Sequence, residues 1–442
     1  MAEHDQGRPR FQLDGLHERS SGHAVVVVPI VKRRDGGLQR SDEARLEEAI
    51  GLARAIELEI VASGTVPIAT PRAATLLGIG KIEEFKGIIA AGDAAVVIVD
   101  HPLTPVQQRN LEKAWDAKVL DRTGLILEIF GRRAQTKEGR LQVELAQLSY
   151  QRGRLVRSWT HLERQRGGAG FMGGPGETQI ESDRRELQGK ISKIERELET
   201  VRRTRSLHRS KRKRVPHPIV ALVGYTNAGK STLFNRLTDA DVFAEDLLFA
   251  TLDPTLRRLK LPDGTLVILS DTVGFVSDLP TNLIAAFRAT LEEVLEADLI
   301  LHVRDIADPD SAVQAADVMS VLDQLGVEAD EARILEVWNK IDLLEPERLE
   351  SIRATRTSGP VLVSAATGQG VEDLLEEVER RITGGNERIH LTMGAEEGAA
   401  ISWLYENAHV VERDDADDGK VELEVLMSDR TAGQFRRLFG RR

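Results

Sequence analysis

The chain has 442 residues, a formal net charge of −11 and 41% hydrophobic residues, so it is too long for one ordinary domain and apolar enough for several cores. It contains no cysteine, which excludes disulfides, thiolate metal sites and cysteine nucleophiles and suits a reducing cytoplasm. Its first 21 residues lack the apolar core of a signal peptide and no apolar run is long enough to cross a bilayer, so we expect a cytoplasmic protein without a membrane span.

The N-terminal part of the chain alternates between strand and helix patterns. After a polar tail at residues 1–22, which we predict to be disordered, β-branched runs alternate with amphipathic stretches. Buried parallel strands connected by helices give this pattern, so we predict a small parallel-sheet α/β subdomain over residues 23–130. The predicted strands are residues 24–31 and 95–100, and the predicted helices are residues 41–58 and 104–115.

Residues 131–214 are strongly basic within an acidic protein. They contain 22 Lys and Arg against 10 Asp and Glu, a local charge of +12, so the rest of the chain carries −23. Opposite charges three and four residues apart predict helices, with residues 139–150 leading in and residues 181–203 following. The glycine-rich stretch between them predicts the tip of a helical hairpin.

That tip contains three candidate RNA contacts, Arg164, Arg166 and Phe171. Guanidinium groups bind phosphates with a planar fork, and an aromatic ring stacks on an unpaired base. A hairpin whose charges are only solvated is the alternative.

A phosphate-binding motif opens the next predicted domain, residues 215–385. The apolar run 219–223 is followed by GYTNAGKS and then by a helix-like stretch. In such a loop the backbone N–H groups point at phosphate oxygens, Lys230 reaches the β- and γ-phosphates, and the Ser231 hydroxyl ligates Mg²⁺. The predicted nucleotide-binding residues here are Gly224, Tyr225, Thr226, Asn227, Ala228, Gly229, Lys230 and Ser231.

Two later motifs have the character of segments that respond to a γ-phosphate. The first is Phe249, Ala250, Thr251, Leu252 and Asp253, and the second is Asp271, Thr272, Val273 and Gly274. The threonine of the first could close onto Mg²⁺ and the γ-phosphate. The carboxylate of the second, at a strand end, could hold Mg²⁺ through water, and its glycine lets a backbone N–H approach the γ-phosphate. Lys230, Thr251 and Gly274 are therefore catalytic candidates, and Ser231 and Thr251 are metal-ligand candidates.

Two more motifs predict that the base is guanine. They are Asn339, Lys340, Ile341 and Asp342, and then Ser364, Ala365 and Ala366. Asp342, predicted as a buried carboxylate, can accept from guanine N1–H and its exocyclic amine, which adenine does not offer. The second motif can present a backbone N–H to guanine O6. Each motif alone could be an ordinary turn, but the ordered set predicts GTP or GDP with Mg²⁺.

The ordered set of motifs resembles that of the Ras-like GTPase fold of P-loop proteins. The motif sequences are similar to those of the HflX family, a relative of the Obg-type GTPases. Residues 131–148 and 173–181 are similar to that family's N-terminal signature, and the resemblance covers about residues 24–385. It implies an α/β multi-domain fold: a Ras-like P-loop GTPase domain preceded by a small parallel-sheet α/β domain with a helical hairpin. Residues 386–442 are predicted to form a small C-terminal α+β domain, which is a weaker match to the family's variable last unit.

The resemblance also implies a function. Proteins of this kind are implied to bind the large ribosomal subunit and its RNA and to split stalled or inactive ribosomes, so we expect a monomeric GTPase that associates with ribosomes. Phe275 stands where Ras-type enzymes carry the water-orienting glutamine, which predicts slow hydrolysis in isolation, with the water-orienting group supplied by another loop or by a partner.

Three alternatives stay open at this stage. They are a GTPase of large-subunit assembly, a GTP-dependent protein-binding switch without an RNA role, and ATP-dependent RNA remodelling by the N-terminal unit. No phosphate loop precedes residue 224, which disfavours the last.

Overall fold

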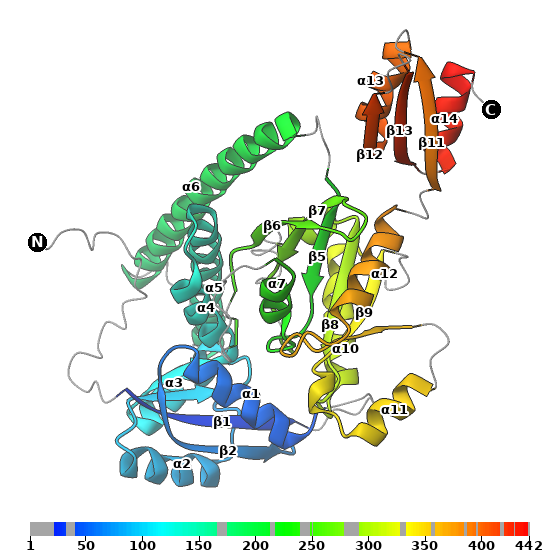
Figure 1. The fold of residues 1–442 in the computed structure, drawn as a ribbon. Coiled ribbons are helices and arrows are strands. Elements are labelled where there is room, and N and C mark those ends of the chain that lie inside the picture. The colour runs from blue at the N-terminus through cyan, green and yellow to red at the C-terminus, as the bar shows by residue number, and fades with distance from the viewer. Residues whose placement is uncertain are drawn as a thin grey trace, which may run out of the picture.

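The computed structural model describes most of the chain, and its strands form three separate sheets within that part (Figure 1). The order of elements confirms the predicted fold class, with a parallel-sheet domain first, a phosphate-loop domain next and an α+β domain last. No helix in the described part is both long and apolar enough to cross a membrane. The described residues are 22–31, 40–165, 175–212, 217–238, 248–249, 251–277, 291–327, 333–354, 359–383, 387–394, 397–415, 420–427 and 429–440.

The N-terminal sheet has four parallel strands in the order β2-β1-β3-β4. Alternate residues of the inner strand β1 pack on opposite faces of the sheet. Val26 packs on the side of α1 and α4, whereas Val27 packs on the side of α2 and α3. Helices therefore cover both faces, as a parallel sheet requires. The elements are β1 (His23–Val31), α1 (Asp42–Arg54), β2 (Glu59–Ile68), α2 (Ile79–Ala91), β3 (Val96–Val99), α3 (Pro105–Trp115), β4 (Lys118–Asp121) and α4 (Arg122–Arg133).

The sequence pattern predicts β1, α1, β3 and α3 but not the other four elements. The strand β2 lies at the sheet edge and contains Gly64 and Pro67, which are tolerated there because an edge strand needs fewer ladder hydrogen bonds. Its alternation of exposed and partly buried residues is weaker than the continuous apolar run of β1.

Two long helices, α5 (Lys137–Gln165) and α6 (Pro175–Arg212), lie side by side after the first sheet (Figure 1). They pack through a small apolar cluster in which Leu141 of α5 meets Ile194 and Leu198 of α6. The apolar contact occupies one stripe and leaves the remaining faces to charged residues. The two segments predicted to be helical therefore lie within longer helices.

The third region holds a six-stranded sheet in the order β10-β9-β8-β5-β7-β6, in which only β6 runs antiparallel to its neighbour. The central strand β5 is buried, so the loop that follows it starts from a fixed point. The strands are β5 (Ile219–Val223), β6 (Thr255–Lys260), β7 (Leu266–Asp271), β8 (Leu299–Asp305), β9 (Ile334–Asn339) and β10 (Val361–Leu362). The helices are α7 (Lys230–Thr238), α9 (Glu292–Leu295), α10 (Ser311–Leu325), η2 (Ile341–Leu343), α11 (Pro346–Ala354) and α12 (Val371–Thr383).

The last region is a three-stranded antiparallel sheet in the order β11-β13-β12, with two helices packed on it. Its core joins Leu423 and Val425 of the central strand to Leu404 and Phe435 of the helices. The elements are β11 (Glu387–Gly394), α13 (Gly398–Asn407), β12 (His409–Asp415), β13 (Lys420–Met427) and α14 (Asp429–Phe439).

One apolar cluster runs from the N-terminal sheet into the six-stranded domain without interruption. It contains Val26 and Phe130 from the first domain and Phe249, Phe275 and Val294 from the second. The Phe130 and Phe249 rings meet edge to face with centroids 4.7 Å apart. The two domains therefore share a core, and that core includes residues from both predicted phosphate-sensing segments.

A buried histidine makes the stability of this fold sensitive to acid. His302 lies inside β8, both of its ring nitrogens lack a hydrogen-bond partner among the described residues, and burial lowers its pKa to about 4. An unfolded histidine titrates near 6.5, so this contribution to stability is complete above about pH 6.5 and is lost as the pH falls towards 4.

We expect His302→Leu to weaken the dependence of the free energy of unfolding on pH. Between pH 7 and pH 5 the apparent free energy of unfolding should fall by about 2 kcal/mol less in the variant than in the unsubstituted protein, as measured by urea titration followed by circular dichroism. Parallel pH profiles for the two proteins would contradict the assignment.

Candidate nucleotide site

The phosphate loop joins the end of β5 to the start of α7, so its backbone lies at a helix N-terminus. Two of its glycines have positive φ and no room for a side chain. A Cβ at Gly224 would lie 2.1 Å from the carbonyl oxygen of Val303, and one at Gly229 would lie 2.2 Å from the side-chain nitrogen of Asn339. The loop therefore packs directly on β8 and on the end of β9.

The Lys230 ammonium is buried inside this loop. Its Nζ donates to the backbone carbonyl oxygens of Gly224, 3.1 Å away, and Tyr225, 2.8 Å away. Burial lowers the pKa of Lys230 to about 8, with Asp271 opposing the shift. A phosphate oxyanion at this point would favour the charged ammonium.

Three oxygen-bearing side chains meet beside the loop. The carboxylate Oδ2 of Asp271, at the end of β7, accepts from the Ser231 hydroxyl at 2.7 Å and from the Thr251 hydroxyl at 3.1 Å, and the two hydroxyls are 3.0 Å apart. The other oxygen, Oδ1, is buried without a hydrogen-bond partner in the described part of the chain. Burial raises the pKa of Asp271. Hydroxyl and carboxylate oxygens are ligands that Mg²⁺ prefers, so these residues fit that ion.

The segment after β7 closes onto the phosphate loop through its backbone. The Thr226 N–H donates to the Phe275 carbonyl at 2.7 Å, and the Phe275 N–H donates to the Gly224 carbonyl at 3.1 Å. A Cβ at Gly274 would lie 3.1 Å from Lys230 Nζ, so the glycine backbone and the lysine face the same small space. The Phe275 ring is buried in the shared core and offers no hydrogen bond to a water.

The base-side motifs also meet. Asn339, buried at the end of β9, donates to the Ala228 carbonyl at 2.8 Å and accepts from the Ala365 N–H at 2.9 Å, so one amide joins the phosphate loop to the Ser364–Ala366 segment. Lys340 has a left-handed backbone and pairs with Asp305 at 2.8 Å. Asp342 is exposed rather than buried as predicted, because it lies on the surface turn η2.

An arginine that the sequence analysis missed supports the base-side segment. Arg236, on α7, donates through Nε to the Ala365 carbonyl at 3.2 Å and through Nη2 to the Ala366 carbonyl. It lies six residues after Lys230, which gives it no recognisable motif of its own. Helix α7 thus holds the phosphate loop at its first turn and the base-side segment at its second.

Several predicted site residues instead face the N-terminal domain. Phe249 and Leu252 lie in the shared core. The Asp253 carboxylate accepts from the Gln135 N–H at 2.8 Å and the Thr136 N–H at 2.9 Å, just before α5 begins, and also from the Thr136 hydroxyl. Ala250, Arg166 and Phe171 lie outside the described residues, and the side chain of Arg164 does too.

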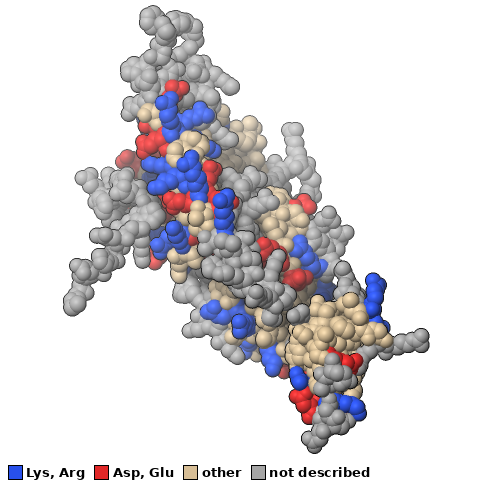
Figure 2. Space-filling model, turned by 90° about the horizontal axis from the view of Figure 1, so that it is seen from above, with Lys and Arg blue, Asp and Glu red and all other residues tan. Residues whose placement is uncertain are grey.

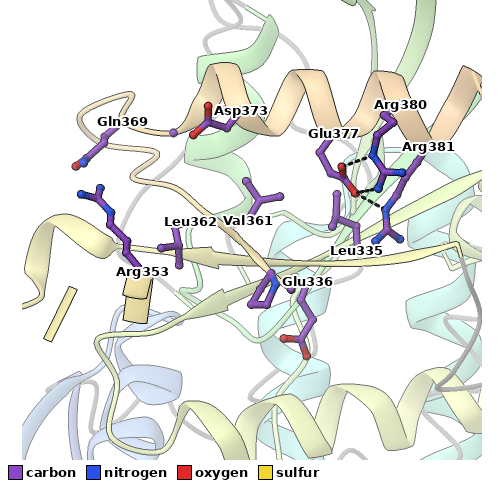
Figure 3. Close-up of a pocket in the computed structure, with 13 residues that line it drawn as sticks. Leu335, Glu336, Arg353, Val361, Leu362, Gln369, Asp373, Glu377, Arg380 and Arg381 are labelled. Atoms are coloured by element: carbon purple, nitrogen blue, oxygen red, sulfur yellow. Dashed lines mark hydrogen bonds and ion pairs between the residues drawn. The ribbon is translucent and has the colours of Figure 1, made fainter. Parts of the chain in front are cut away.

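A cavity of about 1000 Å³ lies elsewhere, beside β9, β10 and α12 (Figure 3). Part of its charged lining is internally paired: Glu377 binds Arg380 at 2.7 Å and Arg381 at 2.8 Å. None of its lining residues belongs to the predicted nucleotide site. We therefore assign it no part in nucleotide binding.

Three features together define a P-loop protein. They are the phosphate loop, the cluster of Ser231, Thr251 and Asp271, and the Asn339 side chain that joins the loop to the base-side segment. Residues 219–340 match a family model described as 50S ribosome-binding GTPase. Residues 43–131 match the GTP-binding GTPase N-terminal model, residues 133–212 the GTP-binding GTPase middle region, and residues 351–442 the HflX C-terminal domain.

Two GTPase relatives give the same result. GTPase HflX of Magnetococcus marinus is 49% identical over 395 residues, covering 89% of this chain and 91% of the relative, and GTPase HflX of Escherichia coli K12 is 43% identical over 412 residues, covering 92% and 94%. The chain belongs to the HflX family of GTPases and hydrolyses GTP. A GTP-binding protein of Sulfolobus solfataricus, solved with GDP, is 23% identical with a TM-score of 0.43, over 82% of this chain and 99% of that one.

The contacts of Arg236 predict a base-specific defect. We expect Arg236→Ala to weaken GTP binding about tenfold, since the backbone N–H groups that would meet guanine O6 lose their support. Binding of 2-aminopurine riboside triphosphate, which keeps the amine but lacks O6, should change little.

Equilibrium titration of the fluorescent 2-aminopurine nucleotide, and competition against it by GTP, would measure both affinities. Arg348→Ala, which removes an exposed arginine from α11, is the matched control. Equal losses for the two nucleotides would show that Arg236 serves stability alone.

Proposed function

We propose that this GTPase binds the large ribosomal subunit through its basic hairpin and splits or rescues stalled or inactive ribosomes, and that the ribosome stimulates hydrolysis. One observation carries the proposal: Asp253, two residues after Thr251, binds the backbone immediately before the hairpin helix α5. A segment that responds to the γ-phosphate is thereby attached to the part of the molecule most suited to RNA.

The site residues have the following proposed roles. Ser231 and Thr251 ligate Mg²⁺ directly, and Asp271 holds it through water; the ion neutralises charge on the β- and γ-phosphates. Lys230 binds the same phosphates, and the Gly274 N–H binds the γ-phosphate. Asn339 and Asp342 select guanine together with the Ser364–Ala366 segment. Phe275 cannot orient the attacking water, so the orienting group comes from another loop or from the partner.

The hairpin supplies the proposed RNA surface. Exposed basic residues on the described part of α6, such as Arg184, Lys193 and Arg196, alternate with acidic ones, and Lys190 pairs with Glu186 at 2.8 Å. Basic and acidic side chains are mixed on the face shown in Figure 2. The unbalanced charge lies elsewhere in the sequence: residues 205–214 hold six Lys and Arg and no Asp or Glu. We therefore assign phosphate contacts to the C-terminal end of α6 and to the hairpin tip.

A sedimentation experiment tests the ribosomal role. Purified large subunits are pelleted with the full-length protein in the presence of a non-hydrolysable GTP analogue, GDP or no nucleotide, and the GTPase rate is measured with and without subunits. We expect co-sedimentation with the analogue, weaker association with GDP, and hydrolysis at least tenfold faster with subunits. If the subunits cause neither nucleotide-dependent binding nor faster hydrolysis, the proposal is overturned and a protein-binding switch is favoured.

The same assay distinguishes the other alternative. Added to stalled 70S-like ribosomes with the GTP analogue, the protein should shift the gradient profile towards free subunits. Binding without any such shift, together with accumulation of precursor particles in cells lacking the protein, would instead indicate large-subunit assembly.

Arg164→Ala combined with Arg166→Ala should weaken subunit binding and reduce its dependence on salt, because fewer phosphate contacts release fewer counterions. GTP affinity should stay unchanged. Arg413→Ala, at an exposed residue of the C-terminal domain, is the charge-matched control for one arginine. If the double variant binds subunits as the unsubstituted protein does at every salt concentration, the hairpin tip makes no contact.

A further inference from the structure

Tyr225, the second residue of the phosphate loop, does not face the phosphate side. Its side chain is buried against the N-terminal domain, where the hydroxyl donates to the Glu48 carboxylate of α1 and accepts from Arg40 Nη1 at 2.9 Å. The same hydroxyl accepts from the backbone N–H of Ser277 at 2.9 Å. One phenol thus joins the phosphate loop, the N-terminal domain and the segment that follows Gly274.

Glu48 is the centre of a buried charge network. Its two oxygens bind Arg122, at 2.6 Å, and Arg40, and Arg122 also binds Asp100 at 2.5 Å. Burial by itself would raise the pKa of Glu48, but Arg122 and Arg40 outweigh it and lower the pKa. Arg40 is also 3.5 Å from Asp310 of the GTPase domain. The carboxylate is therefore charged and fixed between two cations.

The network holds Ser277 by both of its backbone groups. The N–H of Ser277 donates to Tyr225, and its carbonyl accepts from Arg122 Nη2 at 2.7 Å. The Ser277 hydroxyl is 2.8 Å from the Tyr225 hydroxyl and donates to Asp317 of α10 at 2.8 Å. Since Ser277 comes three residues after Gly274, fixing it limits the path that Gly274 can take.

The network occupies the crevice in which α/β sheets of this kind hold ligands. The strand order β2-β1-β3-β4 reverses between β1 and β3, and Asp100 directly follows β3 at the carboxyl edge. Such a reversal opens a crevice at the carboxyl ends of the strands. Here the polar groups at that edge bind a tyrosine and a backbone carbonyl of the GTPase domain.

The first phosphate-sensing segment is fixed from the same side. Phe249 packs on Phe130 and Asp253 binds before α5, so Thr251 lies between two anchored residues. In this arrangement Thr251 is within 3.1 Å of both Ser231 and Asp271, and Gly274 faces Lys230. The groups proposed to meet Mg²⁺ and the γ-phosphate are thus already close together.

We propose that Glu48 is a positioning residue for the nucleotide site. Acting through Tyr225 and Ser277, it holds the segment from Gly274 to Ser277 in the conformation that binds the γ-phosphate, and so makes the protein prefer GTP over GDP. A preorganised segment loses less conformational freedom when the triphosphate binds, whereas GDP does not contact it. The inference rests on the nucleotide site proposed above but not on a ribosomal partner.

Nucleotide titrations of the full-length protein test it. Dissociation constants for a fluorescent non-hydrolysable GTP analogue and for the matching GDP derivative are measured with Mg²⁺ for Glu48→Gln, Tyr225→Phe and the double variant. We expect the GTP-analogue constant to rise about tenfold in each single variant and the GDP constant to change less than twofold. The double variant should be no worse than the singles, because both changes break one pathway.

The controls separate the possible failures. Glu47→Gln, at the exposed neighbour of Glu48 on α1, should match the unsubstituted protein. Tyr225→Phe keeps every ion pair of the network and so remains informative if Glu48→Gln does not fold. Equal losses for both nucleotides, strictly additive losses or tighter GTP-analogue binding would each overturn the inference. If the unsubstituted protein binds neither nucleotide, the proposed nucleotide site itself is overturned.

Discussion

The apolar core shared by the N-terminal and GTPase domains is the constraint on which the nucleotide site depends. Phe249 and Phe275 are both buried in it, one before Thr251 and one directly after Gly274. Residues so close to a buried aromatic anchor have little freedom, because displacing either ring would expose apolar surface and open a void in a packed core. The positions of Thr251 and Gly274 are therefore set partly by packing against a different domain.

The Phe275 side chain has two consequences. A glutamine at this position could orient a water, whereas the phenylalanine stabilises the domain interface and leaves the water without a partner from this residue. The slow hydrolysis that we propose for the isolated protein and the packing of this segment on the N-terminal domain both involve the Phe275 side chain.

The sequence predicted features that depend on neighbours along the chain. The phosphate loop, the aspartate after β7 and the asparagine after β9 are local patterns, and they correctly indicated a P-loop GTPase of the HflX family. The continuous Val-rich run of β1 likewise predicted a buried strand. Asp342 was expected to be buried and is exposed, since a strand end does not determine how deep the next turn lies.

Contacts between distant residues were not predictable from one sequence. Glu48 and Tyr225 are 177 positions apart, and Asp253 and Gln135 are 118 apart, so no spacing rule connects them. On a helix such as α1 a glutamate normally suggests an exposed face. Glu48 is instead a buried anion whose partners are Arg40 and Arg122 of its own domain and Tyr225 of the GTPase domain. Arg236 was missed for the same reason.

Amide hydrogen exchange of the full-length protein tests most directly whether the N-terminal domain holds both segments ready for GTP. Exchange is followed in peptides covering residues 248–253 and 271–277, without nucleotide, with GDP and with a non-hydrolysable GTP analogue. If the N-terminal domain holds these segments, exchange at residues 271–277 is slow in all three states, with only a modest further decrease on adding the analogue. Fast exchange without nucleotide and with GDP, becoming slow only with the analogue, would contradict it.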